Sequence, residues 1–430
     1  MMLLIKNGRV IDPAAGIDET LDILIKDGQI AEIKAKITID SAKTKVIDAS
    51  RLIVTPGLID MHVHLREPGF EYKETIASGA RAAARGGFTT IACMPNTNPV
   101  NDNRGVTEFI MGQAKKANQV NVLPIAAISR GSQGKELTDM ADLKEAGAIA
   151  FSDDGQPVSS SLLFRRALEY SKMLSTLIID HCEDLELAAN GVMHEGQWSV
   201  KLGLKGIPST AEEIMVARDI LLARLTGSRV HLAHISCRGS LELIRWAKEN
   251  NLPVTAEVTP HHLLLTDQMI ADYDPNLKVN PPLRSKEDRQ ALVQALQDGT
   301  IDVIATDHAP HAPDEKDTEF DAAPFGIIGL ESALPVLLDR LVQKKIITFS
   351  RLIELLSTNP ARILGLKNKG HLRVGADADL TLIQPQKKQT IDINFFASKS
   401  KNCPFNGWVV KGMAIMTIVG GRIIFNALKK

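Results

Sequence analysis

The repeated alternation of strand-like and helix-like stretches most constrains how this chain can fold. Short apolar runs, typical of buried strands, occur at residues 52–58, 89–94, 120–128, 148–151, 177–179, 230–235, 254–258 and 303–305. Helical periodicity lies between them, for example at 76–85, 105–117, 160–171, 211–225, 240–250 and 285–297. Eight strand units in about 310 residues predict an α/β fold, a (β/α)8 TIM barrel with enlarged loops.

An open, doubly wound sheet would show the same alternation. Sheets of that kind that bind dinucleotides carry a G-x-G-x-x-G motif after a strand, and no such motif follows a predicted strand here. We therefore predict the closed barrel.

The two ends of the chain share a different pattern. Residues 1–52 contain short strand-like runs, with the hairpin signals Asn7-Gly8 and Asp27-Gly28 between them. Residues 363–430 contain similar runs, and each end alone is too small to form a core of its own. We predict that the two ends join in one β-sandwich domain and that residues 53–362 form the barrel.

Composition excludes several classes of protein. The 430 residues are 44% hydrophobic and 23% charged with a net charge of -1, and no long charged block suggests a nucleic-acid or membrane partner. No apolar run reaches the roughly 18 residues of a membrane span, and the N-terminus lacks the features of a signal peptide. Four scattered cysteines without a C-x-x-C pair indicate free thiols. We expect a soluble, cytoplasmic protein.

The first barrel strand runs into a loop with the sequence Leu-Ile-Asp-Met-His-Val-His-Leu-Arg-Glu-Pro-Gly, residues 58–69. Side chains alternate along a strand, so His62 and His64 point to the same side, about 7 Å apart, and Arg66 continues that row. Two such imidazoles can converge on one divalent cation. An isolated pair is more often a packing feature, so the rest of the chain has to decide.

Polar side chains also follow the other predicted strands, where barrel enzymes place their active sites. In order of the strands they are His62, His64 and Arg66, then Asn96, Asp153 and Asp154, His181, His234, Glu257, His261 and His262, and finally Asp307, His308 and His311. Imidazole and carboxylate groups are the ligands that borderline divalent metals prefer. The sequence therefore predicts a metal site at this end of the barrel.

Several segments together resemble the type I, long bacterial dihydroorotases of the amidohydrolase superfamily. The segments are residues 60–69, 94–99, 151–155 and 305–311, and the likeness extends over essentially the whole chain. The resemblance implies a cyclic amide hydrolase that reversibly cyclises N-carbamoyl-L-aspartate to L-dihydroorotate and water. That reaction is the third step of de novo pyrimidine (UMP) biosynthesis.

The resemblance also implies two zinc ions per subunit. The ligands it implies are His62, His64 and Asp307 for one ion, His181 and His234 for the second, and Asp154 as the bridge. Many relatives bridge their metals with a carbamylated lysine after the fourth strand, a position where this chain has Ser152-Asp153-Asp154. Asp153 is the rival for the bridge, because adjacent residues of a strand face opposite ways.

In the family pattern Asp307 is also the catalytic residue, a general base in hydrolysis and a general acid in ring closure. The substrate-binding residues that the resemblance implies are His64, Arg66, Asn96, Asn280, His311, Phe325 and Gly326. The planar fork of Arg66 suits a carboxylate. A surface salt bridge is the competing interpretation of Arg66, and a plain turn residue that of Asn280.

Other polar residues near the strand ends receive lesser roles. We expect His261 and His262 to support the ligands, and His308 to face away from the site. We interpret Cys237 as packing, and Glu183 and Glu257 stay unassigned.

Two other functions compete with this interpretation. Hydantoinase, dihydropyrimidinase and allantoinase share the fold and the metals, but they resemble one another in a strand-4 lysine that is missing here. A non-catalytic, dihydroorotase-like scaffold would have lost metal ligands, whereas all six expected positions are filled. Besides the small-molecule substrate, the resemblance leaves a homodimer and a complex with aspartate transcarbamoylase open.

Overall fold

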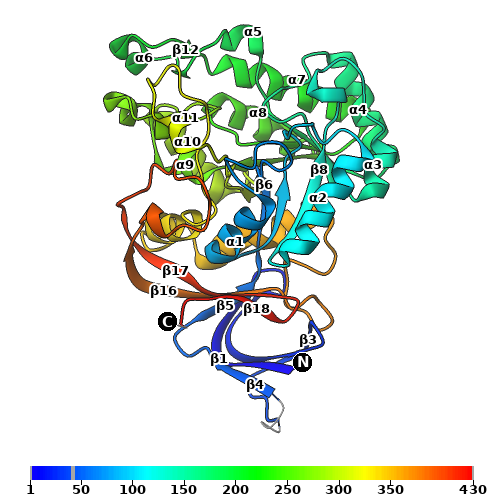
Figure 1. The fold of residues 1–430 in the computed structure, drawn as a ribbon, viewed down its shortest axis with the longest axis vertical. Helices are drawn as coiled ribbons and strands as arrows, with labels where there is room; N and C mark the ends of the chain where they lie inside the picture. Colours follow the sequence, from blue (N-terminus) through cyan, green and yellow to red (C-terminus); the bar gives the residue numbers. More distant parts are fainter. Residues whose placement is uncertain (1, 40–43, 429–430) are drawn as a thin grey trace.

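The computed structural model describes residues 2–39 and 44–428 and contains a barrel and a separate sheet. Figure 1 shows the barrel in the upper part and the sheet in the lower part, where both chain ends lie. In the described ranges, no helix combines the length and hydropathy needed to cross a membrane.

The barrel consists of parallel strands in sequence order, as predicted. They are β6 (Leu58–Val63), β7 (Phe88–Cys93), β8 (Asn121–Ala126), β9 (Ala150–Phe151), β10 (Ile178–Asp180), β13 (Val230–Leu232), β14 (Val254–Val258) and β15 (Val303–Ile304). The chain beyond β15 closes the ring, since the His64 amide donates to the His308 carbonyl at 2.8 Å. The fold class predicted from the alternation is confirmed.

Helices surround the barrel, and each of the six predicted helical stretches is a helix. Those six are α1 (Ile76–Gly86), α2 (Arg104–Ala117), α4 (Ser161–Met173), α7 (Thr210–Thr226), α8 (Arg238–Glu249) and α10 (Lys286–Asp298). Shorter helices are α3 (Met140–Ala146), α5 (Leu185–Ala188), α6 (Gln197–Leu202), α9 (Pro260–Leu264), α11 (Pro313–Lys316), α12 (Ala333–Leu337), α13 (Phe349–Ile353) and α14 (Asn359–Leu364). A small sheet pairs β11 (Met193–His194) with β12 (Gly206–Ile207).

Both chain ends build the second sheet, as the sequence predicts. Its strands are β1 (Met2–Asp12), β2 (Ile17–Lys26), β3 (Gln29–Lys34), β4 (Thr44–Asp48), β5 (Ile53–Pro56), β16 (Leu380–Thr390), β17 (Val409–Val419) and β18 (Arg422–Asn426). The two halves meet where β16 pairs antiparallel with β5. The sheet has its own apolar core, in which Ile5, Val54 and Ile418 are fully buried. β5 pairs here although it falls within the range 53–362, and the domain boundaries themselves stay a prediction.

One of the two expected hairpins is absent. Asp27-Gly28 forms the turn between β2 and β3, whereas Asn7-Gly8 lies inside β1, where the pairing with β2 shifts register. The prediction at Asn7-Gly8 is therefore wrong. The prediction failed because a β-bulge can contain the same positive φ as a tight turn. Asn7 has such an angle, with a φ of 62°.

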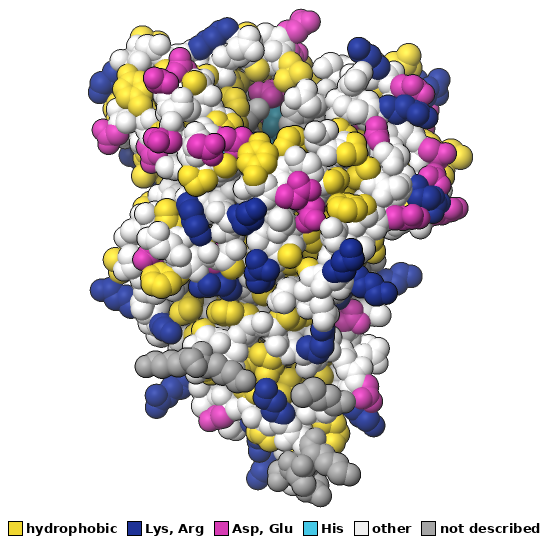
Figure 2. All heavy atoms as spheres, viewed as in Figure 1, with side chains coloured by type: hydrophobic (Ala, Val, Ile, Leu, Met, Phe, Trp, Pro, Cys, Tyr) yellow, Lys and Arg dark blue, Asp and Glu magenta, His cyan; other side chains and the backbone are white. Residues whose placement is uncertain are grey.

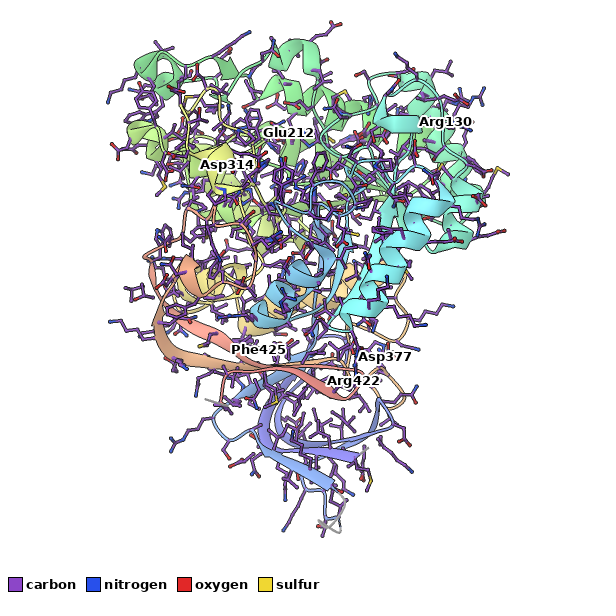
Figure 3. All side chains as sticks on the ribbon, viewed as in Figure 1. Arg130, Glu212, Asp314, Asp377, Arg422 and Phe425 are labelled. Carbon is purple, nitrogen blue, oxygen red and sulfur yellow. The ribbon has the colours of Figure 1, made fainter. Side chains whose placement is uncertain are left out.

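The sheet is fastened to the barrel helices by hydrogen bonds from its barrel-facing strands. Thr381 of β16 donates to the carbonyl of Gly87 at 2.6 Å, and Thr417 of β17 donates to that of Ala84 at 2.7 Å. Arg422 of β18, labelled in Figure 3, donates to the side chain of Asn118 at the end of α2 at 2.7 Å. The barrel therefore rests on a sheet that contains both ends of the chain.

Candidate active site

The carboxyl ends of the barrel strands surround a cavity of about 240 Å³. Figure 2 shows this hollow in the upper part of the molecule, with acidic and histidine side chains at its bottom. Its lining includes His64, Arg66, Asn96, Asp154, His181, His234, Asn280, Asp307, His311, Phe325 and Gly326. His62 is fully buried beside them. The structure thus brings every expected site residue to one place.

Asp154 lies at the centre of the four expected histidine ligands. Its Oδ1 is 3.3 Å from His62 Nε2, 3.6 Å from His234 Nε2 and 3.8 Å from His181 Nδ1. Its Oδ2 is 3.5 Å from His64 Nε2. Burial acts to raise the pKa of Asp154, but the imidazoles outweigh it and hold this pKa well below its usual value.

Asp153 points in the other direction. Its carboxylate accepts the backbone N–H groups of Ile128, at 2.8 Å, and Ser129, at 3.1 Å, in the loop after β8. Burial raises the pKa of Asp153 to about 6, although its bonds to Ser129 act against that rise. Of the two adjacent aspartates, Asp154 alone faces the histidines.

Asp307 lies against the first pair of histidines. Its Oδ1 is 3.0 Å from His64 Nε2 and 3.5 Å from His62 Nε2. Burial would raise the pKa of Asp307, but its bond to His64 and the nearby imidazoles lower it to about 2. The carboxylate is therefore ionised at neutral pH. On the other side of the site, His181 Nδ1 and His234 Nε2 face each other at 2.9 Å.

The donor atoms fit a divalent metal. His62 Nε2 and Asp154 Oδ1 are both buried and have no hydrogen-bond partner within residues 2–39 and 44–428. In this cavity, two groups of side chains could each hold an ion, namely His62 with His64 and Asp307, and His62 with Asp154 and His234. Buried polar atoms without partners are costly unless something else binds them, so these facing atoms suit a cation.

Two glutamates left unassigned by the sequence orient the histidines. Glu257 of β14 bonds His62 Nδ1 at 2.7 Å, and Glu183 bonds His181 Nε2 at 3.2 Å. Burial opposes protonation of both imidazoles, yet the nearby carboxylates raise the pKa of each above its usual value. Carboxylates that hold the far nitrogen of a metal-binding histidine are typical of metal sites. A glutamate directed inward at the end of a predicted strand could have indicated Glu257.

Arg66 lies in the cavity wall next to the cluster of four histidines and two aspartates. The structure records one hydrogen bond for its guanidinium, from Nε to the Pro310 carbonyl at 3.2 Å. The loop is held in place by Glu67, whose carboxylate accepts the N–H of Ile76 at 2.8 Å and an N–H of Gln113 at 3.0 Å. The surface salt bridge considered from the sequence is not seen in the described residues, and the terminal nitrogens of Arg66 are available to a ligand.

Two more expected substrate-binding residues, Asn96 and His311, line the same cavity as Arg66. Asn96 bonds His64 Nδ1 at 2.8 Å, and His311 Nε2 donates to the Phe325 carbonyl at 2.8 Å. Burial lowers the pKa of His311 to about 2, with added repulsion from Arg66 and the nearby lysines. His311 is therefore neutral at physiological pH.

Asn280, Phe325 and Gly326 also line the cavity. Asn280 donates to Glu183 at 2.9 Å, which connects it to the histidine cluster. The Gly326 N–H is bonded to the Lys278 carbonyl at 2.9 Å, so it is not free for a ligand. A Cβ on Gly326 would lie 2.8 Å from the Ala309 carbonyl oxygen, which explains a glycine at this place.

The backbone is in the left-handed region at three site residues. The φ angles of Arg66, His234 and Asp307 are 62°, 31° and 46°. Non-glycine residues rarely adopt such angles, and those that do cluster at functional sites. This conformation was not foreseeable from the sequence.

Two of the remaining histidines near the strand ends, His308 and His262, are bonded away from the cluster, whereas the buried His261 Nε2 has no hydrogen-bond partner among the described residues. His308 lies 3.4 Å from Glu74 and accepts the N–H of Gly329, so it faces away as predicted. His262 donates to the Pro281 carbonyl at 2.9 Å. Cys237 is buried against Glu212, and all four cysteines are free thiols.

Comparisons with known proteins agree on one family. A model described as dihydro-orotase-like matches residues 50–240, and an amidohydrolase family model matches residues 247–425. A dihydroorotase of Pelotomaculum thermopropionicum is 57% identical over 99% of this chain and 98% of its own length. One of Syntrophus aciditrophicus is 54% identical over 99% of both chains, and one of Geobacter sulfurreducens is 55% identical over 99% of both.

Solved structures with the same fold include cyclic amidases. L-hydantoinase from Arthrobacter aurescens superposes with a TM-score of 0.89 and 28% identity, over 99% of this chain and 96% of that one. Dihydropyrimidinase from Brevibacillus agri gives a TM-score of 0.85 at 22% identity, over 99% and 95%. The second likeness bears on the fold alone.

Proposed function

The chain belongs to the dihydroorotase family of cyclic amide hydrolases, and we propose that its cavity binds zinc and interconverts N-carbamoyl-L-aspartate and L-dihydroorotate. In this proposal the reaction is the third step of pyrimidine synthesis. The observation that carries it is the convergence of four histidines and two aspartates beside Arg66, in a chain 51–57% identical to dihydroorotases.

We propose that His62, His64 and Asp307 would hold one zinc and that His181 and His234 would hold the other, with Asp154 between them. The first set is one of the two groups of facing donor atoms. The second set extends the other group, which contains Asp154 and His234, to His181, whose Nδ1 is 2.9 Å from His234 Nε2. When bound, such ions would polarise the amide carbonyl and lower the pKa of water. Glu257 and Glu183 would fix the orientation of His62 and His181.

We assign the proton transfer to Asp307. Its pKa of about 2 keeps the carboxylate ionised, so it can accept the proton of the attacking water during ring opening. It then delivers that proton to the leaving nitrogen of the opened amide. In ring closure the same group takes the opposite roles. The carboxylate lies among imidazoles, which stabilise its ionised form.

The substrate carboxylate is assigned to Arg66, with Asn96 and His311 beside it. The terminal nitrogens of Arg66 offer two parallel donors, which match the geometry of a carboxylate. Asn280 and the backbone at 325–326 would contact the edge of the ring. An uncharged hydantoin ring would leave the Arg66 guanidinium in the cavity wall without an anion, which favours dihydroorotate as the substrate.

Metal analysis coupled to hydrolysis assays tests this function. Purified wild-type protein should contain zinc and hydrolyse dihydroorotate in preference to hydantoin and allantoin. Asp154→Ala should lose zinc and slow turnover about 1,000-fold or more, because it removes the carboxylate shared by both ions. Asp153→Asn is the matched control and should retain zinc. Preference for hydantoin would support a hydantoinase, and protein with neither zinc nor turnover would support a scaffold.

We place this activity in the cytoplasm, in keeping with the four free, buried thiols. The family suggests a homodimer or a complex with aspartate transcarbamoylase. Size-exclusion chromatography of the protein, alone and mixed with that partner, distinguishes the two assemblies.

A further inference from the structure

A segment far from the barrel strands in sequence reaches the rim of the cavity. Residues 397–403, here called the rim segment, lie between β16 and β17 of the terminal sheet. In Figure 1 this orange-red stretch rises from the sheet along the left side of the barrel. The rim segment therefore connects the sheet formed by the chain ends to the loops around the site.

Asn402 is the innermost contact of the rim segment. Its side chain is 3% exposed, and its Nδ2 donates to the carbonyls of Ala309 and Gly326, both at 3.0 Å. Its Oδ1 accepts the N–H of His311 at 3.3 Å, and its own carbonyl accepts the N–H of Ile328 at 3.0 Å. Through its side chain and its backbone carbonyl, Asn402 thus joins two backbone segments, 309–311 and 326–328.

Those two segments form the part of the wall assigned to the substrate. Ala309, His311 and Gly326 all line the cavity. The two segments already approach closely, since a Cβ on Gly326 would lie 2.9 Å from the His311 ring. The position of the His311 ring therefore depends on how far apart Asn402 holds the two backbones.

The rim segment also holds the loop that follows Arg66. Ser400 donates to the Lys73 carbonyl at 2.7 Å, and Ser398 donates to the Glu74 carboxylate. Lys73 Nζ in turn lies 3.4 Å from His311 Nδ1. The two sides of the carboxylate subsite, one at Arg66 and one at His311, are thus fastened to the same seven-residue stretch.

We propose that Asn402 is a positioning residue for the substrate carboxylate, fixing His311 and the Gly326 backbone opposite Arg66. This inference rests on the proposed function, because it assumes that the carboxylate binds at Arg66 and His311. Asn402 has no recorded contact with the metal-type ligands, so its loss should weaken substrate binding more than the chemical step. If Asn402 supported the fold alone, its replacement would instead lower the free energy of unfolding and leave KM unchanged.

Asn402→Ala and Asn406→Ala make the matched pair for this test. Asn406 lies four positions away and is exposed, and its recorded side-chain bond is to the Ile393 N–H at 3.3 Å. For dihydroorotate, Asn402→Ala should raise KM about tenfold or more, with kcat within about threefold of wild type. Zinc content should be unchanged, and Asn406→Ala should match wild type in KM. If Asn402→Ala does not fold, Asn402→Ser, which keeps a donor, should give a smaller rise in KM.

The outcomes separate this inference from the function on which it rests. Wild-type protein that fails to hydrolyse dihydroorotate refutes the proposed function. With an active wild type, a folded Asn402 variant with unchanged KM overturns the positioning role alone. An equal rise in KM for Asn406→Ala, or a loss of activity that follows zinc content, overturns it as well.

Discussion

At the scale of single residues, the arrangement of the site depends on which of two adjacent carboxylates points toward the histidines. Asp153 and Asp154 are neighbours after β9, and only Asp154 faces the histidines. Asp153 instead bonds the backbone after β8 and fixes the loop from which Asp154 projects. The sequence limits the choice to these two residues, because backbone alternation allows one of them to point inward, but it cannot say which.

Acidification should reveal the low pKa of His311. In the folded protein, burial and the adjacent cations hold this pKa at about 2, whereas an unfolded histidine titrates near 6.5. On acidification the unfolded chain binds the proton first, so the contribution of His311 to stability is present above pH 6.5 and is lost as pH falls below it. From pH 7.5 to 5, the free energy of unfolding of wild type should fall by about 2 kcal/mol more than that of His311→Gln.

Urea unfolding at the two pH values measures this difference. His371→Gln is the control, because His371 is half-buried outside the cavity, where its Nε2 bonds the Lys367 carbonyl, and its replacement should leave the pH dependence of stability unchanged. Parallel pH dependence in wild type and His311→Gln would contradict the prediction.

Glu257 should control metal affinity without binding metal. It holds His62 Nδ1 at 2.7 Å, and glutamine in its place loses the charge that favours this orientation. Glu257→Gln should weaken zinc binding about 10- to 100-fold, as measured by competition with a chromogenic chelator. Glu249→Gln, at the exposed end of α8, should bind zinc like wild type. Equal zinc affinity in both variants would show that Glu257 has no such role.

At the scale of elements, the strand and helix pattern was predictable because it is local. Each barrel strand is a short apolar run, and each main helix shows its own period. The hairpin prediction at Asn7-Gly8 failed because the same dipeptide suits both a tight turn and a β-bulge, and here it forms a bulge. β5 belongs to the terminal sheet because it pairs with β1 and with β16, and β16 is more than 300 residues away; no local pattern contains such pairings.

The end of α1 offers a test of how the sheet and the barrel pack together. Gly87 caps this helix with a φ of 94°, and a Cβ there would lie 2.9 Å from Thr381 of β16. Gly87→Ala should lower the free energy of unfolding by about 2–4 kcal/mol, because it adds a clash to an unfavourable φ. Gly299→Ala, at the end of α10, has a φ of 83° but no atom within 4 Å, so it should cost about 1 kcal/mol.

Chemical denaturation of the two glycine variants gives these values, and their KM should equal that of wild type, since both lie away from the cavity. Equal losses of stability in the two variants would contradict the prediction, because they would mean that β16 moves enough to accommodate the methyl group of Gly87→Ala without a clash.

At the scale of the whole molecule, the site is assembled from both halves of the chain and from the terminal sheet. The ligand positions could be proposed from the sequence because barrel strands place their ends at one rim. Glu257 has a partial signal, because it is an inward-directed glutamate at the end of a predicted strand. Glu183 and Asn402 could not be proposed, since a single glutamate or asparagine in a loop has no spacing that marks its partner. Their roles become visible when distant segments are brought together.

Metal removal should affect the stability of the whole fold. The proposed ligands come from five barrel strands or the loops after them and meet only in the folded chain, so an ion held by them would bind the native state and not the unfolded one. Free zinc at 1,000 times its dissociation constant would then add about 4 kcal/mol to the free energy of unfolding. Chelated wild-type protein should melt several degrees lower than the zinc-loaded form, and added zinc should restore the Tm.

Asp154→Ala provides the control for metal removal, because it lacks the carboxylate that faces all four histidines. Its Tm should respond little to zinc or to chelator. Differential scanning calorimetry over a series of free zinc concentrations measures both proteins. A Tm that rises equally in wild type and in Asp154→Ala would place the stabilising ion somewhere other than this cavity, because the unfolding equilibrium can respond only to sites that the folded chain creates.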